Sequence, residues 1–111
     1  MDYLFIGGEE RPFRASWKQL KALAVKKGIK KLTALGEALG DLTLDEVPFF
    51  VHLCLKAGSE KQGDTFDYTI ADVEEWVDDD MSVVMTAFQK VADNLSGQGK
   101  PQAVQPPPEA N

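Results

Sequence analysis

The fold is decided by the stretch Thr43-Leu-Asp-Glu-Val-Pro-Phe-Phe-Val-His-Leu-Cys-Leu55. Its first four residues, Thr-x-x-Glu, match a capping box, in which the Thr and Glu side chains bond to backbone amides at the start of a helix. Pro48 is compatible with the first helical turn, where the amides lack helical partners. The residues that follow are apolar on almost every side, which indicates a helix buried at the centre of a bundle. We expect this helix to end at Ala57-Gly58.

The segments after this helix predict two more helices. Residues 59–68 are mostly polar, which is typical of a loop, and we expect Phe66 and Tyr68 to tether that loop to the core. Thr69 can then cap a helix whose apolar positions are Ile70, Val73, Trp76 and Val77. Asp80 can start a last helix. Its apolar residues follow the spacing of an amphipathic helix without a break: Met81, Val84, Met85, Phe88, Val91, Ala92 and Leu95.

The segments before the central helix predict a β-hairpin and two helices. Short extended runs flank Gly7-Gly8, a typical hairpin turn, and Pro12 makes the second strand an edge strand or a very short one. Ser16 and Gln19 form a second capping box, and Gly28 ends that helix in the left-handed conformation. The apolar face of this helix is expected to hold Trp17, Leu20, Leu23 and Ala24, opposite Lys18, Gln19, Lys21 and Lys26. A further short helix is expected around Leu32, Leu35 and Leu39.

Together these elements predict a mainly α fold, a small bundle of about four to five helices with an N-terminal β-hairpin, over residues 2–95. A chain of 111 residues is long enough for one domain with a core and too short for two. From Ser96 onward the sequence holds four of the six prolines and few apolar residues. We expect this Pro-rich stretch, residues 96–111, to be a disordered tail.

Charge divides the chain into a basic and an acidic part. Residues 1–31 carry a net charge of +5 and residues 32–111 a net charge of −11, which gives the chain its overall −6. Such a division is informative about partners rather than about the fold. We therefore expect contacts with other proteins, self-association included, at the basic residues Lys18, Lys21, Lys26 and Lys27 and the acidic residues Asp72, Glu75, Asp78 and Asp79.

Other interpretations of these residues stay open. The two charged regions can face each other within one monomer as weak surface ion pairs, or both can be solvated faces. Met81 and Met85 are interpreted first as core residues and second as an adaptable binding surface.

The residue types that carry out catalysis are not arranged for it. His52 and Cys54 lie two positions apart on the central helix, so their side chains point about 200° apart around its axis and cannot form a nucleophilic pair. Asp78-Asp-Asp80 supplies carboxylates, but the glycine and closing glutamate of an EF-hand loop are absent, and a solvated acidic face is favoured. We expect no enzymatic activity, no cofactor and no metal.

The composition favours a cytoplasmic protein. The longest apolar run is far shorter than the roughly 20 residues that span a bilayer, so no membrane contact is expected. The start, Met1-Asp-Tyr-Leu-Phe-Ile, lacks the basic lead and cleavage site of a signal peptide. Cys54 is the single cysteine, which excludes an intrachain disulfide. The net negative charge argues against nucleic acid as the main partner.

The order of features along the chain is more telling than any single motif. A hairpin ends in Arg11-Pro-Phe-Arg14, and a Trp- and Lys-containing helix follows over residues 16–23. A Leu-Asp-Glu-Val helix spans residues 44–55, then come Tyr68-Thr-Ile-Ala-Asp-Val-Glu-Glu-Trp-Val77 and an amphipathic helix over residues 81–95. Over residues 2–95 this order resembles the tail assembly chaperones of long-tailed bacteriophages of the siphophage type.

The resemblance implies a small, mostly helical protein that is absent from the finished virion. Members of that family associate with one another, with the tape measure protein and with tail tube subunits, and they keep these soluble in the host cytoplasm until the tail polymerises. Many members gain a C-terminal extension by programmed frameshifting, and the Pro-rich end here is compatible with the unextended product. The family carries no catalytic residues.

Two other functions fit the same residues. A helical protein–protein adaptor or regulatory subunit unrelated to phage needs the same acidic body and exposed faces. A small DNA-binding regulator would use the basic first helix, although the helix after Gly28 is Leu-rich and carries no Arg. A tape measure gene immediately downstream would favour the phage chaperone over the adaptor.

Removal of the predicted tail, residues 96–111, is expected to leave the melting temperature nearly unchanged, because this segment has little apolar area to bury. Thermal unfolding of the full and shortened chains, followed by circular dichroism, measures the difference. A large decrease would mean that the segment packs on the body.

Overall fold

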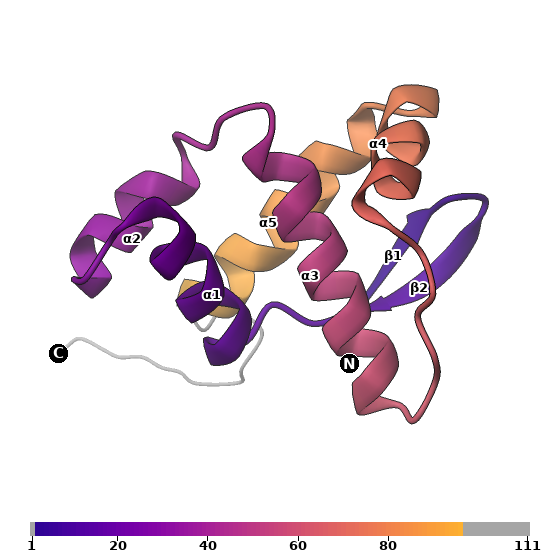
Figure 1. Cartoon of the computed structure of the whole chain (residues 1–111), viewed down its shortest axis with the longest axis horizontal. Coiled ribbons are helices and arrows are strands. Elements are labelled where there is room, and N and C mark those ends of the chain that lie inside the picture. Colours follow the sequence, from indigo (N-terminus) through magenta and orange to yellow (C-terminus); the bar gives the residue numbers. More distant parts are fainter. Residues whose placement is uncertain (1, 97–111) are drawn as a thin grey trace, which may run out of the picture.

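The chain folds as an N-terminal β-hairpin followed by five α-helices (Figure 1). The structure, a computed structural model, describes residues 2–96. The elements are β1 (Asp2–Ile6), β2 (Glu9–Phe13), α1 (Trp17–Lys27), α2 (Leu32–Leu39), α3 (Glu46–Lys61), α4 (Ile70–Asp79) and α5 (Ser82–Ser96). The predicted mainly α fold is therefore confirmed. Ser96, the first residue of the predicted disordered tail, is instead the last residue of α5, and the rest of that predicted tail lies outside the described residues.

The hairpin forms as predicted around a two-residue turn. Gly7 and Gly8 both have positive φ, 66° and 83°, which a turn that matches the twist of the two strands requires. The strands pair antiparallel, with Tyr3 opposite Pro12. Because the sheet has two strands, both are edge strands, and Pro12 is tolerated.

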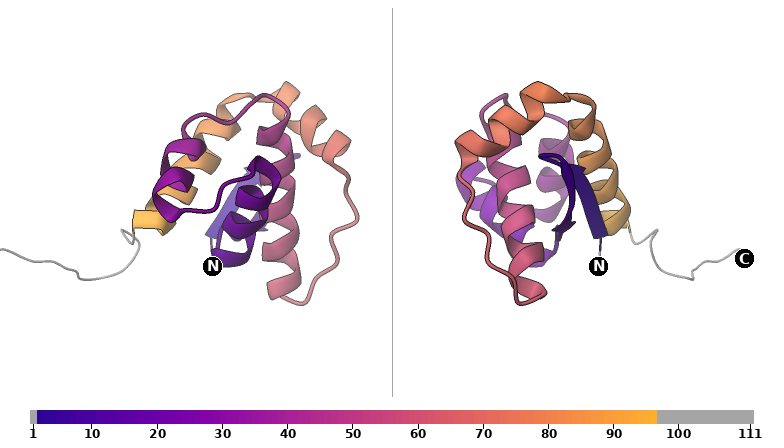
Figure 2. Two further views of the ribbon diagram at one scale, coloured as in Figure 1. Left: turned by 60° about the vertical axis from the view of Figure 1, so that its left-hand side comes forward. Right: turned by 90° about the vertical axis from the view of Figure 1, so that its right-hand side faces the viewer.

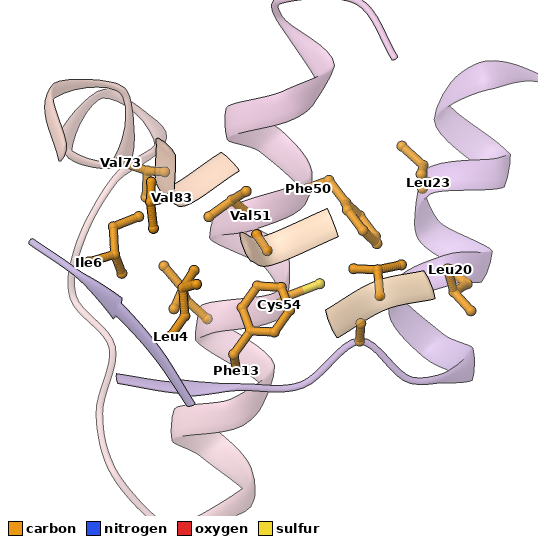
Figure 3. Close-up of a cluster of buried hydrophobic side chains, with 14 of the residues drawn as sticks. Leu4, Ile6, Phe13, Leu20, Leu23, Phe50, Val51, Cys54, Val73 and Val83 are labelled. Carbon is orange, nitrogen blue, oxygen red and sulfur yellow. The ribbon is translucent and has the colours of Figure 1, made fainter. Parts of the chain in front are cut away.

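Helix α3 lies at the centre of the fold and packs against β2, α1 and α4, while α5 packs against β1. Figure 3 shows its buried side chains between those of the hairpin and those of α1. The predicted capping box starts α3: the Thr43 amide donates to Glu46 Oε1 at 2.9 Å, and the Glu46 amide donates to Thr43 Oγ1 at 3.3 Å. The most fully buried large side chains are Phe13, Phe50, Leu4, Leu23, Leu55, Val51, Val73 and Cys54.

The predicted end of α3 at Ala57-Gly58 is wrong, since the helix continues to Lys61. Gly58 is buried where β2 crosses the helix, and a Cβ atom added there would lie 2.5 Å from the carbonyl carbon of Pro12. This glycine allows two backbones to approach each other closely. The glycine that follows the helix in the left-handed conformation is Gly63, with φ 82°.

The face of α1 differs from the predicted one. Leu20 and Leu23 are buried as expected, but Trp17 is 68% exposed and Gln19 is buried. Gln19 is drawn inward because its Oε1 accepts the amide hydrogen of Ser16 at 3.0 Å, as the predicted capping box requires. Gly28 ends the helix with φ 72°, as predicted.

The buried stripe of α5 is also shifted from the predicted one. Val83, Ala87 and Val91 are buried, whereas Met81 and Met85 are 72% and 73% exposed. The helix packs against β1, and its compact residues allow this close approach. The first interpretation of the two methionines, as core residues, is therefore wrong.

Arg11 joins the hairpin to α4. Its side chain is 9% exposed, and Nε donates to the carbonyl oxygen of Ile6 at 2.9 Å. The guanidinium carbon lies 4.4 Å from the ring centre of Trp76 and 4.8 Å from that of Tyr68, so the cation contacts two aromatic rings. Trp76 also packs on Gly7, where an added Cβ would lie 2.6 Å from the indole ring.

The loop before α4 is tethered by aromatic contacts, as predicted. Phe66 stacks edge-on between the rings of His52 and Tyr68, and Tyr68 stacks on Trp76. His52 Nε2 lies 2.7 Å from the carbonyl oxygen of Tyr68. Among residues 2–96, none of the helices combines the length and the apolar character that crossing a membrane requires.

Gly58→Ala is expected to lower the free energy of unfolding by about 1–3 kcal/mol, because the added methyl group forces β2 away from α3. Gly36→Ala serves as the control. Nothing lies within 4 Å of a Cβ at this helical position, so stability should rise by about 0.5–1 kcal/mol. Urea unfolding of both variants measures the two values, and equal effects would contradict the close approach.

Arg11→Lys is expected to lower the free energy of unfolding by about 1–3 kcal/mol, because an ammonium group cannot stack on both rings and reach the turn carbonyls together. The matched control is Arg14→Lys, since the Arg14 side chain donates a long hydrogen bond, 3.3 Å from Nε to Ser16 Oγ. Urea unfolding should show a clearly smaller loss for the control. If Arg11→Lys lowers the free energy of unfolding no more than Arg14→Lys does, the stacked guanidinium does not hold α4 in place.

Candidate protein-interaction surfaces

An apolar groove with acidic residues at its rim lies where the loop before α3, helix α4 and the start of α5 meet. Leu44 is 91% exposed beside it, and the exposed Met81 and Met85 line it as well. The hollow measures about 410 Å³, which leaves room for side chains of a partner. We call it the methionine groove, formed by Leu44, Val47, Pro48, Glu74, Val77, Asp78, Met81, Val84 and Met85.

Local structure fixes the walls of this groove. The Thr69 amide donates to Asp72 Oδ2 at 2.8 Å and the Asp72 amide to Thr69 Oγ1 at 3.1 Å, which starts α4 with the predicted cap. Asp80 then starts α5, since its Oδ1 accepts the Ser82 amide hydrogen at 3.1 Å. Two residues therefore separate α4 from α5, and Met81 is held at their junction.

The predicted acidic residues divide among different roles. Asp78 lines the methionine groove, together with Glu74, which was not predicted. Glu75 is exposed on α4, and Asp79 lies at a different hollow, beside the hairpin turn. Asp72 serves as a helix cap. Glu74 lies four positions before Asp78 and therefore on the same face of α4, so helical spacing is the signal that could have found it.

A second groove, rimmed by lysines, lies between α1 and α2. Trp17 and Val25, 68% and 72% exposed, lie along it. Its hollow measures about 340 Å³. We call it the lysine groove, formed by Trp17, Leu20, Lys21, Ala24, Val25, Ile29, Lys30, Lys31 and Leu35.

The predicted basic residues are only partly available for a partner. Lys18 and Lys21 are exposed, and Lys21 lines the lysine groove. Lys26 Nζ lies 4.7 Å from the centre of the Phe49 ring. Lys27 is paired within the molecule, with Nζ 2.7 Å from Glu46 Oε1. The hydrogen bond from Lys27, with that from the Thr43 amide, lowers the pKa of Glu46 below its usual value.

Lys30 and Lys31, rather than the predicted Lys26 and Lys27, are the basic residues that line the lysine groove together with Lys21. They follow Gly28, and its left-handed turn brings them back beside α1, where they complete the rim. Both residues contribute to the basic count of the N-terminal part. Sequence reasoning missed them because their position depends on how α2 folds back on α1.

The two grooves do not meet within the molecule. Helices α1 and α2 lie on one side of α3, and α4 lies on the other (Figures 1 and 2). Arg11 forms an ion pair with Glu9, and Lys27 forms one with Glu46. None of these four residues lines either groove. Within residues 2–96, the alternative of ion pairs inside one monomer is thus found at Lys27, and no ion pair joins the predicted basic residues to residues 72–79.

The groups considered for catalysis lie away from both grooves. Cys54 is fully buried, and burial raises the pKa of its thiol, which disfavours the thiolate that nucleophilic attack requires. His52 contacts Phe66 and the carbonyl of Tyr68. In the described part of the chain, no three His, Cys, Asp or Glu side chains are placed to share a metal ion.

The two grooves are thus surface features of the described residues from which a function can be inferred. They combine exposed large apolar side chains with rims of opposite charge. Comparisons with models of protein families, with curated proteins and with solved structures found no match to the chain.

Proposed function

We propose that the protein is a non-enzymatic tail assembly chaperone of a long-tailed phage, which acts in the host cytoplasm and is absent from the mature virion. Its clients are the tape measure protein, the tail tube protein or both. The proposal combines the order of elements along the chain with one structural observation: the methionine groove leaves Leu44, Met81 and Met85 exposed together. Contiguous exposed apolar side chains with a polar rim mark a protein interaction site.

The chemistry of the methionine groove suits a temporary partner. Met81 and Met85 have unbranched, flexible side chains that adapt to different apolar anchors. An assembly chaperone must cover the apolar assembly surface of a subunit and release that subunit when subunits begin to bind one another. A groove that adapts to its ligand without a deep, rigid pocket supports such reversible binding.

The acidic rim favours clients with basic residues beside their apolar anchors. Glu74 and Asp78 are exposed on α4, directly beside the apolar floor. Charges at the rim of an interface speed encounter and disfavour partners of like charge, more than they add affinity. The same groove would also serve an adaptor outside phage, so the experiment must identify the client.

The triple variant Leu44→Ser, Met81→Ser and Met85→Ser is expected to lose client binding, because it removes the apolar anchors of the methionine groove. Tape measure protein or tail tube protein from the same genome, co-expressed with the chain, should become soluble and co-purify with the unmodified protein. The amount of client that co-purifies with the triple variant should be lower than with the unmodified protein by a factor of about ten or more.

Phe5→Ser is the matched control, because Phe5 is an exposed apolar residue outside the methionine groove. The substitutions affect exposed side chains, so each variant should keep its helical content, measured by circular dichroism. Failure of the unmodified protein to bind either client would overturn the phage function and leave the adaptor. Equal binding by the triple variant would overturn the role of the groove.

A further inference from the structure

We infer that the lysine groove is a binding site for a small anionic amphiphile, a carboxylate on an unbranched alkyl chain of medium length. The inference goes beyond the proposed function, which uses the methionine groove, and it does not depend on a client. Three features of the lysine groove support it: an apolar floor, lysines that gather toward one end, and a lining of described residues that includes no acidic side chain.

The floor of the lysine groove is apolar and long enough for an alkyl chain. Leu20 and Leu35 line the groove and are buried. Trp17 and Val25 lie eight positions apart on α1, which corresponds to about 12 Å along the helix axis, and both are largely exposed. The hollow of about 340 Å³ lies in the size range of small-ligand sites, which are mostly apolar with a few charged groups. A bound alkyl chain would therefore cover side chains that are now in water.

The positive charge lies mainly at one end of this groove. Trp17 is the first residue of α1, whereas Lys30 and Lys31 follow its last turn. The Ile29 amide donates to the carbonyl oxygen of Ala24 at 2.8 Å, which ties this segment to the end of α1. Helix α2 begins there with no side-chain cap and no acidic residue in its first turn, so its positive end adds to the lysine charges. A ligand with one anionic head and an apolar tail matches this arrangement.

The lysines of the groove are available to an anion. Lys21, Lys30 and Lys31 are exposed, and neither of the ion pairs found in residues 2–96 involves them. An ammonium group and a carboxylate form a charge-assisted hydrogen bond, which is stronger than a hydrogen bond between neutral groups. A carboxylate head therefore gains contacts in the lysine groove that an uncharged head does not gain.

The methionine groove is the opposite case within the same molecule. Its floor is also apolar, but Glu74 and Asp78 line it, so it repels a carboxylate. The two grooves lie on different sides of α3, so an amphiphile bound at one leaves the other open to a client (Figure 2). An acidic helix of another protein would match lysines spread along the whole groove, whereas two of these three lie together at one end.

Decanoate tests the inference on the full chain, at concentrations below those at which it forms micelles. Binding should cover Trp17 and shift the tryptophan fluorescence to shorter wavelength, and Trp17→Phe should lack this shift. Amide chemical shifts measured by NMR should change around Ala24 and Leu35 and stay constant around Met85. Decyl maltoside has the same chain with an uncharged head, and decyltrimethylammonium has a cationic head. Each should bind the lysine groove at least about tenfold more weakly than decanoate.

Two variants test the groove itself. The first carries Lys21→Gln, Lys30→Gln and Lys31→Gln, which keeps polar side chains and removes their charge, and it should bind decanoate at least about tenfold more weakly than the unmodified protein. The second, Val25→Glu, places a carboxylate at an exposed position of the groove and should weaken binding as well.

The matched control carries Lys56→Gln, Lys61→Gln and Lys90→Gln, which changes net charge as much as the first variant does, outside the lysine groove. It should bind decanoate like the unmodified protein. All variants should keep their circular dichroism spectra, because the substitutions affect side chains that are not part of the core.

Three results would overturn the inference: no binding of decanoate, equal binding of the anionic and uncharged amphiphiles, or equal binding by the lysine variant and its control. Binding of an acidic amphipathic peptide at this groove, without binding of decanoate, would also overturn it and assign the groove to another protein. A client that fails to bind, with decanoate binding intact, would overturn only the proposed function.

Discussion

The close approach of strand β2 to helix α3 is the constraint on which the rest of the structure depends. At Gly58 the helix presents no side chain to the backbone of Pro12. The Arg14 amide donates to the carbonyl oxygen of Cys54 at 2.9 Å. This hydrogen bond joins the end of β2 to α3 at a second point. The hairpin is thus held at one height along α3, where Arg11 meets the ring of Trp76. The position of α4, and with it the acidic wall of the methionine groove, follows from this contact.

The methionine groove exists because α5 buries its smaller apolar residues. Val83 and Ala87 face the core, while Met81 and Met85 remain in water. Burying a methionine side chain stabilises a fold by about 1.5–3 kcal/mol. With Met81 and Met85 exposed, the protein lacks this contribution to its folding free energy. Natural chains keep such features where the surface serves binding, and the same reasoning applies to Trp17 on the other side of α3.

Features determined within a few residues were predictable from the sequence, and features determined by packing were not. The caps at Ser16 and Thr69 and the turn at Gly28 depend on side chains no more than four positions away, so local patterns were sufficient. Gly58 was misinterpreted because its partner is Pro12, which is distant in sequence. The stripe that α5 buries depends on β1, and an amphipathic pattern does not distinguish between neighbouring stripes. For the same reason the candidate site was predicted only in part. Four predicted residues line the two grooves: Lys21, Asp78, Met81 and Met85. Four lining residues were missed, Leu44, Glu74, Lys30 and Lys31, and two predicted residues, Lys27 and Asp72, form contacts within the molecule instead.

The single thiol of the chain lies fully buried on α3, close to the point where β2 meets the helix. A reagent that modifies thiols can reach Cys54 only when the core around it opens, because reaction requires contact with solvent and the thiolate form. The labelling rate of this side chain therefore reports how often the core opens under native conditions, without any engineered probe. Binding at either groove that tightens the fold would slow labelling, so Cys54 records the effect of partners that never touch it.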